Sequence, residues 1–287
     1  MRHGILAAVL LATASLGAQG QSWDRIRGEV AEVGPAGPHW FLVVRSFDVG
    51  IAHLVDGDTG EVEGTLSLSL YTPGLVRDAS RNLVHAYGSY YSRLYSGTRT
   101  DVVQSFDART LAVVGEVEIP PKSAGIGHSG MLGLIAGRFL GVWNITPAMS
   151  VSIVDVEAGT FVGELSTPGC AGVYPVGSGF LMPCGDGTLQ YVALDADGAE
   201  TSRSRSANFF DVQEDPVFDY AVPTKTGWLF MSFEGKVFEA TVGRGGVEVS
   251  APWSIFDDAA EAEHSWRIGG SQPFAYNAET GLLVTLM

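Results

Sequence analysis

Cysteine and positive charge are both scarce in this chain. Of its 287 residues, two are Cys and 17 are Lys or Arg, against 32 Asp and Glu, so the formal net charge is −15. A nucleic-acid surface needs a basic patch to replace the counterions of the phosphates. The charge therefore argues against nucleic acid as a partner. The acidity favours cationic small molecules or basic protein faces, or it simply keeps an apolar protein in solution.

Sequence motifs of common catalytic and metal sites are missing as well. The six histidines show no HxxH or HExxH spacing and no paired cysteines accompany them, so we expect no metal site. There is neither a GxSxG elbow nor a phosphate-binding loop. Nothing in the sequence therefore predicts a catalytic residue in this chain.

Long apolar runs are absent except near the N-terminus. Arg2 and His3 precede an apolar run over residues 5–11, and small residues follow up to Gly20. This order is typical of a secretory signal peptide, and the run is shorter than the roughly 20 residues of a membrane span. We expect residues 1–20 to be a signal peptide and residues 21–287 to be one exported domain without a membrane span, located in a bacterial periplasm.

The sequence does contain a repeated turn. An apolar residue precedes each of Asp56, Asp107 and Asp155, a Gly follows eight positions later, and a weaker copy surrounds Asp195. Asp suits a turn because its carboxylate accepts a hydrogen bond from the amide two residues on. The four Asp lie 51, 48 and 40 residues apart, which fits one four-stranded blade of a β-propeller. We therefore assign these carboxylates to turns rather than to acid–base chemistry.

Runs of aromatic and β-branched residues between the turns predict strands, and helical periodicity is nearly absent. A second type of hairpin, around Asp78, Gly137 and Asn277, is expected to join the first two strands of a blade. A short acidic helix is suggested only over residues 255–265. The predicted fold is an all-β propeller. Its clearest strands are expected at residues 40–45, 102–106, 151–154 and 227–233.

The two cysteines, Cys170 and Cys184, flank a Val-Gly-Ser-Gly turn around Gly177. A hairpin that closes there places the sulfurs opposite each other on neighbouring strands, at a Cα separation that a disulfide can bridge. Export favours a structural disulfide. A redox-active pair is the weaker alternative, because there is no CxxC spacing.

Residues 90–110 carry Arg93 and Arg99 on a Gly-containing excursion that a blade does not need. Taken alone, these are solvated loop charges. The stretch is, however, similar to the heavy chain of the quinoprotein amine dehydrogenases, the methylamine and aralkylamine dehydrogenase family, in its Ser-Arg, Gly, Arg-Thr-Asp and Phe-Asp series. Further similarities follow in the same order at residues 54–64, the Cys pair, 235–240, 266–270 and 275–276.

This resemblance implies a seven-bladed propeller. The family continues for roughly another two blades beyond the GLLVTLM end of this chain, so we expect about five to six blades here. The chain is then either a truncated product or partial record, or a shortened propeller that closes with fewer blades or with help from its partner.

The resemblance also implies a function. The chain is expected to be the non-quinone heavy subunit of a periplasmic amine dehydrogenase, assembled as a heterotetramer of two heavy and two light chains. The light chain carries tryptophan tryptophylquinone, so this chain is expected to hold no cofactor. The enzyme would convert primary amines to aldehydes and pass the electrons to a cupredoxin such as amicyanin or azurin.

The family places an aromatic residue of its substrate channel in a Gly-Gly-Phe-Leu-Pro-Asn series. Here residues 69–74 read Ser-Leu-Tyr-Thr-Pro-Gly, so the Gly pair is lost and the aromatic has moved by one position. Leu70 or Tyr71 is expected to line the channel, with ordinary strand-end packing of Tyr71 as the alternative. The residues expected at the partner interface are Arg93, Arg99, Trp266 and Arg267.

Two other functional classes stay open. One is a non-catalytic periplasmic propeller, a scaffold or binding protein or a truncated remnant without a light chain. The other is a self-sufficient propeller dehydrogenase that holds pyrroloquinoline quinone. It would need its own calcium and stacking site, and no constellation in the sequence suggests one.

Overall fold

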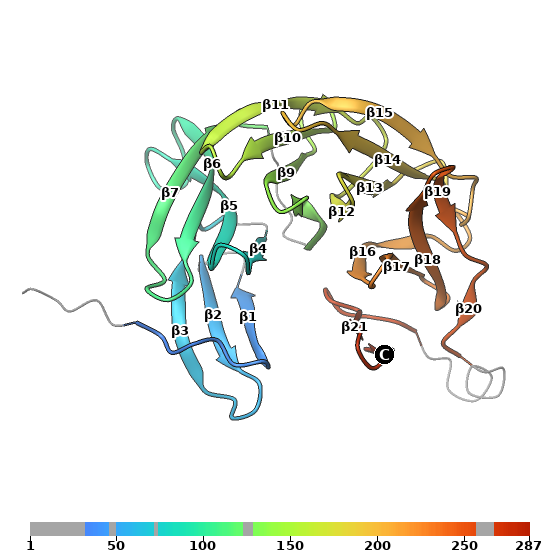
Figure 1. Ribbon diagram of the computed structural model, residues 1–287, viewed down its shortest axis with the longest axis horizontal. Coiled ribbons are helices and arrows are strands. Elements are labelled where there is room, and N and C mark those ends of the chain that lie inside the picture. The colour runs from blue at the N-terminus through green and yellow to red at the C-terminus, as the bar shows by residue number, and fades with distance from the viewer. Residues whose placement is uncertain (1–31, 46–49, 72–73, 123–128, 257–266) are drawn as a thin grey trace, which may run out of the picture. The chain divides into compact units, whose positions relative to one another are not determined.

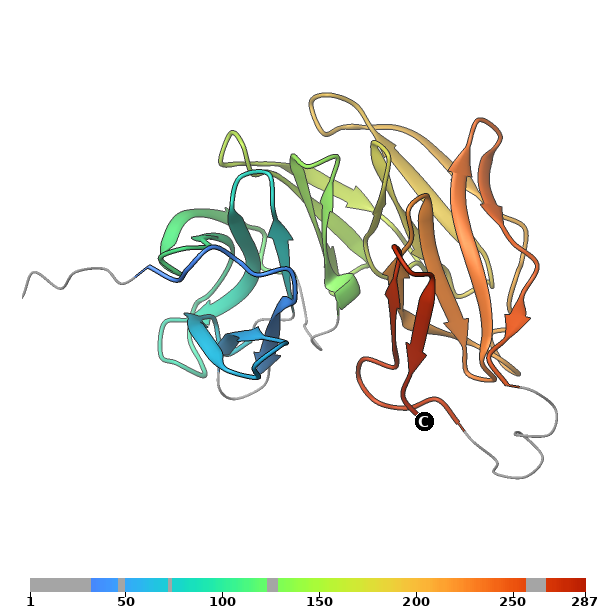
Figure 2. The same ribbon diagram turned by 60° about the horizontal axis from the view of Figure 1, so that its bottom comes forward.

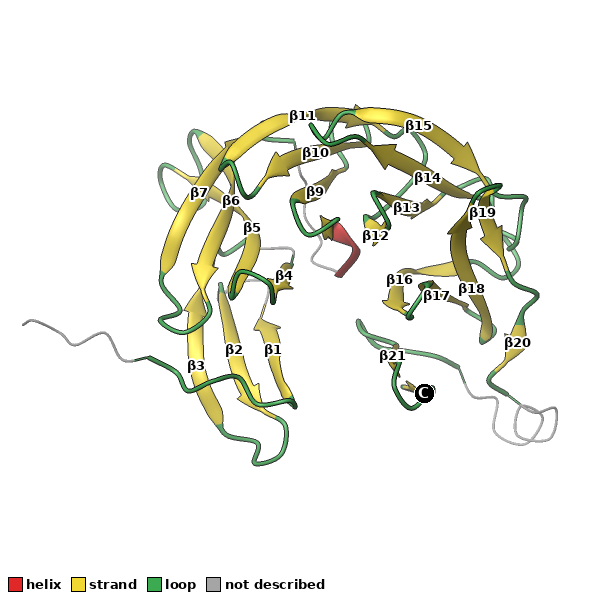
Figure 3. Cartoon of the chain, viewed as in Figure 1, coloured by secondary structure: helices red, strands yellow, loops and turns green. Residues whose placement is uncertain are grey.

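The computed structural model describes residues 32–71, 74–122, 129–256 and 267–287, apart from 46–49, and these belong to one compact unit, Glu32–Met287. The predicted signal peptide and most of the acidic segment 255–265 lie outside the described residues. Strands account for the regular structure of the described part, with one short 3-10 helix, η2 (Ser129–Met131), and no α-helix in it (Figure 3). The all-β prediction is confirmed.

The strands form six sheets, each an antiparallel series. The first contains β1 (Trp40–Arg45), β2 (Ile51–Asp56) and β3 (Val62–Ser67). The second contains β4 (Leu75–Asp78), β5 (Leu83–Tyr91), β6 (Arg99–Asp107) and β7 (Val113–Ile119), and the third β8 (Leu132–Ile135), β9 (Phe139–Asn144), β10 (Ser150–Asp155) and β11 (Thr160–Ser166). The fourth contains β12 (Tyr174–Val176), β13 (Gly179–Pro183), β14 (Leu189–Leu194) and β15 (Glu200–Arg205). The fifth contains β16 (Val217–Pro223), β17 (Gly227–Ser232), β18 (Lys236–Gly243), β19 (Gly246–Val249) and β20 (Trp253–Ser254), and the sixth β21 (Phe274–Asn277) and β22 (Leu282–Thr285).

Successive sheets pack face to face in chain order (Figure 1). First strands neighbour each other across sheets, as in the pairs β4 with β8, β8 with β12 and β16 with β21. This arrangement of meandering blades with their first strands together is that of a β-propeller. The propeller prediction is confirmed.

Hydrophobic cores lie between the sheets rather than within one central core. The core between the third and fourth sheets, for example, joins Trp143 and Ile153 of one to Phe180 and Val192 of the other. Burying each such large apolar side chain contributes roughly 1.5–3 kcal/mol. Equivalent clusters lie between the other successive pairs of sheets. Stability therefore depends on contacts between neighbouring blades.

The repeated Asp turns are present as predicted. Oδ1 of each Asp accepts a hydrogen bond from the amide two residues on, and each turn joins the last two strands of a four-stranded blade or of the first sheet. The N···O distances are 2.8 Å at Asp56, 2.9 Å at Asp107, 3.0 Å at Asp155 and 2.9 Å at Asp195. At Asp107, hydrogen bonds from the backbone amides of Thr110 and Arg109 lower the pKa of the carboxyl group.

The glycine that follows the turns at Asp56, Asp107 and Asp155 marks a β-bulge. Gly64, Gly115 and Gly163 pair with the residues directly before a shift of register in the neighbouring strand. A bulge adds one residue to one strand and increases the local twist. In the repeat, the Asp therefore corresponds to a turn and the Gly to a bulge, and only the turn was predicted from the sequence.

The predicted disulfide is present. Cys170 and Cys184 are bonded, with S–S at 2.06 Å, on neighbouring antiparallel segments that flank the β12–β13 hairpin, whose turn contains Gly177 at φ 57°. Both residues are buried in the core between the third and fourth sheets. The disulfide therefore links the segment before β12 to the segment after β13, at the start of the fourth blade.

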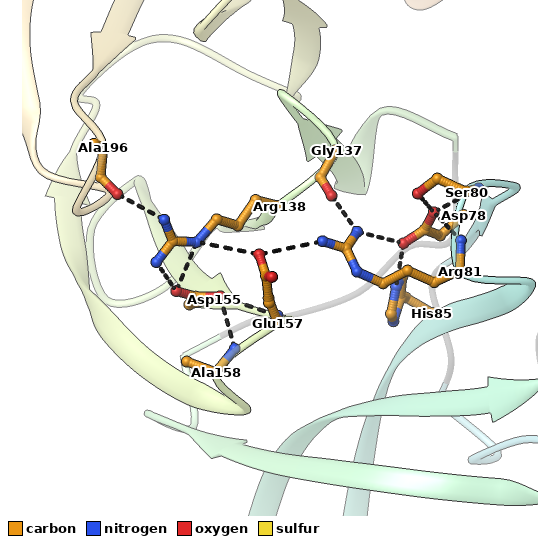
Figure 4. Close-up of polar contacts among 10 residues, drawn as sticks. All are labelled: Asp78, Ser80, Arg81, His85, Gly137, Arg138, Asp155, Glu157, Ala158 and Ala196. Atoms are coloured by element: carbon orange, nitrogen blue, oxygen red, sulfur yellow. Dashed lines mark hydrogen bonds and ion pairs between the residues drawn. The ribbon is translucent and has the colours of Figure 1, made fainter.

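Arginines at the first turn of two blades hold neighbouring blades together (Figure 4). Arg81, in the β4–β5 turn, donates to Asp78 Oδ2 at 2.9 Å and to the carbonyl oxygen of Gly137 in the next sheet. Arg138, in the β8–β9 turn, donates to the carbonyl oxygen of Ala196 in the sheet after that, at 3.0 Å. Hydrogen bonds from these two arginines thus connect three successive blades.

Candidate functional site

The excursion that separates β5 from β6 is an ordered loop, residues 92–98. Ser92 and Thr98 pair through their backbones at 3.0 Å, and the Thr98 amide also donates to Ser92 Oγ at 3.1 Å. Leu94 and Gly97 adopt positive φ angles, 64° and 99°. An alanine Cβ at position 97 would lie 2.3 Å from Ser92 Oγ, so the turn requires glycine there. The loop is held in one conformation by its own hydrogen bonds.

A buried ion pair lies at the base of this loop. Asp101 is fully buried, and Arg99 donates to both its carboxylate oxygens, at 2.6 and 2.7 Å. The hydroxyls of Tyr87 and Ser89 also donate to this carboxylate, both at 2.8 Å. Burial alone would lower the pKa of Arg99, but the hydrogen bonds and charge of Asp101 outweigh it and raise that pKa. Arg99, predicted at a partner interface, thus points toward the buried Asp101 and ties the end of the loop to it. Its predicted role at the interface stays a prediction.

Tyr71 lies beside this hairpin. Its ring meets the ring of Tyr91 edge to face, with centroids 5.5 Å apart, and its side chain is 41% exposed. Leu70 is half-buried directly before it. Together with Leu94, these residues line a cavity of about 150 Å³ at the end of β5. The two channel residues predicted from sequence thus share a small, mainly apolar cavity with the 92–98 loop.

The tip of the loop is apolar and exposed. Tyr95 is 66% exposed and Leu94 60% exposed, and the predicted interface residue Arg93 is exposed beside them. Large apolar side chains on a rigid, exposed loop are typical of binding surfaces. Arg93 in this loop and Arg99 directly after it were predicted from the sequence, whereas Leu94 and Tyr95 were not, although the run YYSRLY is rich in aromatic residues.

The other predicted interface residues belong to a different part of the chain. Arg267 is exposed directly before the last sheet, and its neighbour Ile268 is buried against β16–β18. Figure 2 shows the last sheet, in red, next to the orange strands of the fifth sheet. Trp266 lies outside the described residues. Their predicted role at the interface stays a prediction.

A second, larger cavity of about 730 Å³ lies between the first and second sheets. Its walls are mainly apolar, with Trp40, Leu54 and Leu111 among them. Its charged groups have partners: Arg109 pairs with Glu32, and Arg77 donates to Asn82 and to backbone carbonyls. It does not include the predicted channel residues.

Neither a metal site nor a membrane helix is found in the described part of the chain. No group of three or more His, Cys, Asp or Glu side chains converges there. None of its helices is long and apolar enough to cross a membrane.

Comparison with known proteins identifies the family. The family model of the methylamine dehydrogenase heavy chain (MADH) matches residues 38–286. The chain belongs to this family. Curated heavy chains of the family are similar to it at low identity: that of Paracoccus versutus is 28% identical over 239 residues, and that of Methylorubrum extorquens 27% over 256 residues.

The matches cover more of this chain than of its relatives. They span 82% and 87% of the chain but 55% and 60% of the two methylamine dehydrogenase heavy chains. The chain therefore spans little more than half the length of these curated relatives.

Solved structures support the fold alone. A functionally unknown protein from Desulfotomaculum acetoxidans superposes with a TM-score of 0.51 at 12% identity, over 87% of this chain and 79% of that one. The dihydro-heme d1 dehydrogenase NirN superposes with a TM-score of 0.50 at 20% identity, over 78% of this chain and 46% of that one. At these identities nothing about activity carries over.

Proposed function

We propose that this chain is the non-quinone heavy subunit of a periplasmic amine dehydrogenase. The observation that carries the proposal is the family match over residues 38–286. The reaction is the oxidation of a primary amine with water to an aldehyde and ammonia, which releases two protons and two electrons. Tryptophan tryptophylquinone on a light chain supplies the electron acceptor for this step, and a cupredoxin such as amicyanin or azurin takes the electrons onward.

In this reaction the chain would bind the light chain and shape the entrance for the amine, and it would transfer no protons itself. We propose that the light chain docks on the exposed tip of the 92–98 loop, around Arg93, Leu94 and Tyr95. The loop is held in place by its backbone bonds and by the Arg99–Asp101 pair, so little conformational freedom is lost on docking. Leu70 and Tyr71, beside this loop, would then lie at the entrance to the quinone and exclude water around the amine.

Co-expression with a cysteine-rich light chain of the family tests the proposal. We expect the two chains to co-purify in equal amounts, with quinone absorbance and with amine-dependent reduction of a dye. A stable complex with full quinone content that reduces no dye with any primary amine would contradict the enzymatic function. Failure of the chains to associate would favour the alternative, a non-catalytic propeller.

A charge placed on the loop tip tests the docking surface. Tyr95→Asp is expected to weaken association about 30-fold or more, because an exposed aromatic residue at an interface centre commonly contributes 2 kcal/mol or more. Val114→Asp is the matched control, since Val114 is 59% exposed on β7 of the same sheet. Equal affinities of the two variants would place the interface elsewhere.

A further inference from the structure

The large cavity between the first and second sheets is lined by aliphatic side chains from both. Its volume is about 730 Å³, within the range of pockets that bind small molecules in proteins. Leu42, Leu54 and Leu66 line it from the first sheet, and Val84 on β5 lines it from the second. The cavity is partly open, so a molecule can enter it and be surrounded by two blades.

Leu111, which forms part of the wall, has a strained backbone. In the turns of the first three sheets, the residue four positions after the Asp adopts a left-handed conformation, with φ of 76° at Gly60, 56° at Leu111 and 67° at Gly159. Glycine adopts this conformation freely, whereas a bulky side chain there costs free energy. Residues held in such conformations cluster at binding sites, where the surrounding structure holds them.

The side chain of Leu111 reaches from the second sheet to the first. A Cβ added to Gly64 on β3 would lie 2.3 Å from Cδ1 of Leu111, so the leucine takes the space that a side chain at Gly64 would fill. Leu111 therefore joins the two blades at the cavity while it forms part of the wall.

Arg77 provides a positive charge at the cavity. Its guanidinium donates to two backbone carbonyl oxygens, at 3.1 and 2.7 Å, and to Asn82 Oδ1 at 2.6 Å. These acceptors are neutral, and among the described residues no carboxylate pairs with Arg77, whereas Arg109 of the same wall pairs with Glu32. The N–H of Nε and one N–H of Nη2 are left for a carboxylate, which can accept from both. Arg77 is exposed, so a ligand can reach it.

We propose that this cavity binds an amphipathic monocarboxylate, whose apolar body lies between the two blades and whose carboxylate accepts hydrogen bonds from Arg77. Aliphatic walls favour an apolar body, and a guanidinium without an anionic partner favours an acidic group. The net charge of −15 repels molecules with several negative charges, so a single carboxylate fits best. This site is independent of the proposed function and can be measured on the full chain alone.

The first experiment uses a dansylated fatty acid and follows energy transfer to it from tryptophan. Trp40 lines the cavity, so Trp40→Phe is expected to reduce the transfer from the protein to the bound probe. Decanoate and 1-decanol, which differ in charge, then displace the probe and give the two affinities. Unchanged transfer in Trp40→Phe would place the probe elsewhere, and absence of binding to the wild type would overturn the site.

The second experiment tests the charge. Arg77→Gln is expected to weaken binding of decanoate about five-fold or more and to leave that of 1-decanol within about two-fold, because only the acid uses the guanidinium. Arg244→Gln is the matched control, since Arg244 is exposed in the β18–β19 turn of the fifth sheet. An equal loss for both ligands in Arg77→Gln, or an equal loss of decanoate in Arg244→Gln, would overturn the carboxylate site.

Two further variants test the apolar part. Ala108→Trp fills the cavity and is expected to abolish binding of both ligands. Leu111→Gly relieves the strained turn but removes part of the wall, so both affinities should fall about five-fold or more. If Ala108→Trp does not fold, Leu111→Gly still decides, because glycine occupies the same position in two other turns. Unchanged affinities in Leu111→Gly would overturn the site.

Discussion

Arg138 donates from Nε and Nη2 to the same carboxylate oxygen of Asp155, at 3.0 and 2.6 Å. The pair joins the first turn of the third blade to its last turn, and the guanidinium continues to the carbonyl oxygen of Ala196 in the fourth blade. Asp155, which belongs to the repeated Asp turns, is therefore also part of the contact between the third and fourth blades (Figure 4).

Removing the guanidinium of Arg138 should weaken the contact between the third and fourth blades and so destabilise the fold. Arg138→Ala is expected to lower the free energy of unfolding more than a substitution on an exposed loop does, because hydrogen bonds to charged groups are lost while Asp155 stays buried. Urea unfolding followed by tryptophan fluorescence measures the change. Arg93→Ala, on the exposed loop, is the control and should stay within about 0.5 kcal/mol of wild type. Equal effects of the two variants would contradict a clasp at Arg138.

The buried pair below the loop should be more costly to break. Asp101→Asn removes the charge of a fully buried carboxylate and leaves the half-buried Arg99 beside a neutral group, and we expect a loss on the order of 2 kcal/mol in the free energy of unfolding. Asp58→Asn is the control, because Asp58 and its partner His39 are both exposed and such pairs contribute about 1 kcal/mol or less. Thermal unfolding of both variants gives the comparison. A loss below 1 kcal/mol for Asp101→Asn would show that the pair is not a structural anchor.

The lowered pKa of Asp78 should make the stability of the fold depend on pH. Burial alone would raise its pKa, but hydrogen bonds from Ser80 and Arg81 lower the pKa to about 2, against 3.8 for an unperturbed Asp. Because the pKa is lower in the folded state, the charged form stabilises the fold above pH 4. That contribution, about 2 kcal/mol, is lost as the pH falls toward 2.

Denaturant unfolding of the wild type and Asp78→Asn at several pH values measures this effect. The difference in free energy of unfolding between the two should be greatest at pH 5 to 7 and shrink by about 2 kcal/mol toward pH 2. A difference that is independent of pH would mean that Asp78 is not ionised with a lowered pKa in the folded state.

The disulfide should stabilise the fourth blade. Cys170 and Cys184 are 14 residues apart in the sequence, and closing a loop of about 15 residues is worth roughly 3 kcal/mol in the chain-entropy model. The double variant Cys170→Ser, Cys184→Ser is expected to lose about that amount, and a reducing agent should have the same effect on the wild type but none on the variant. Identical melting of oxidised and reduced wild type would contradict a structural role.

Short-range features of this fold could be predicted from the sequence. The strand at Trp40–Arg45 was predicted with its observed bounds, and the turns at Asp56, Asp107 and Asp155 were predicted with their hydrogen bonds. The partners in these cases lie within a few residues of each other, so the residue types alone decide the geometry. The bulges at Gly64, Gly115 and Gly163 were missed, because a bulge depends on the pairing with a neighbouring strand.

The candidate site could be predicted only in part. Leu70 and Tyr71 were selected from sequence, and the resemblance drew attention to Arg93 and Arg99. That Arg99 turns inward to a buried carboxylate could not be predicted, because Asp101 is polar and carries no signal of burial. The contributions of Leu94 and Tyr91 to the cavity were missed for the same reason: the contacts of their side chains depend on how the loop folds back over the sheet.

The amino-acid sequence by itself determined the all-β character, the blade repeat, the disulfide and the family, since each is encoded in local patterns of residue type or in similarity along the chain. Only the tertiary structure decided which residues surround Tyr71. Ser69 meets Ser89 and Gly88 across a distance of about 20 residues in sequence, and a contact of that kind forms through packing of a turn onto a neighbouring sheet. The turn chemistry at Ser69 is local, but the orientation of the turn is set by the blade on which it packs.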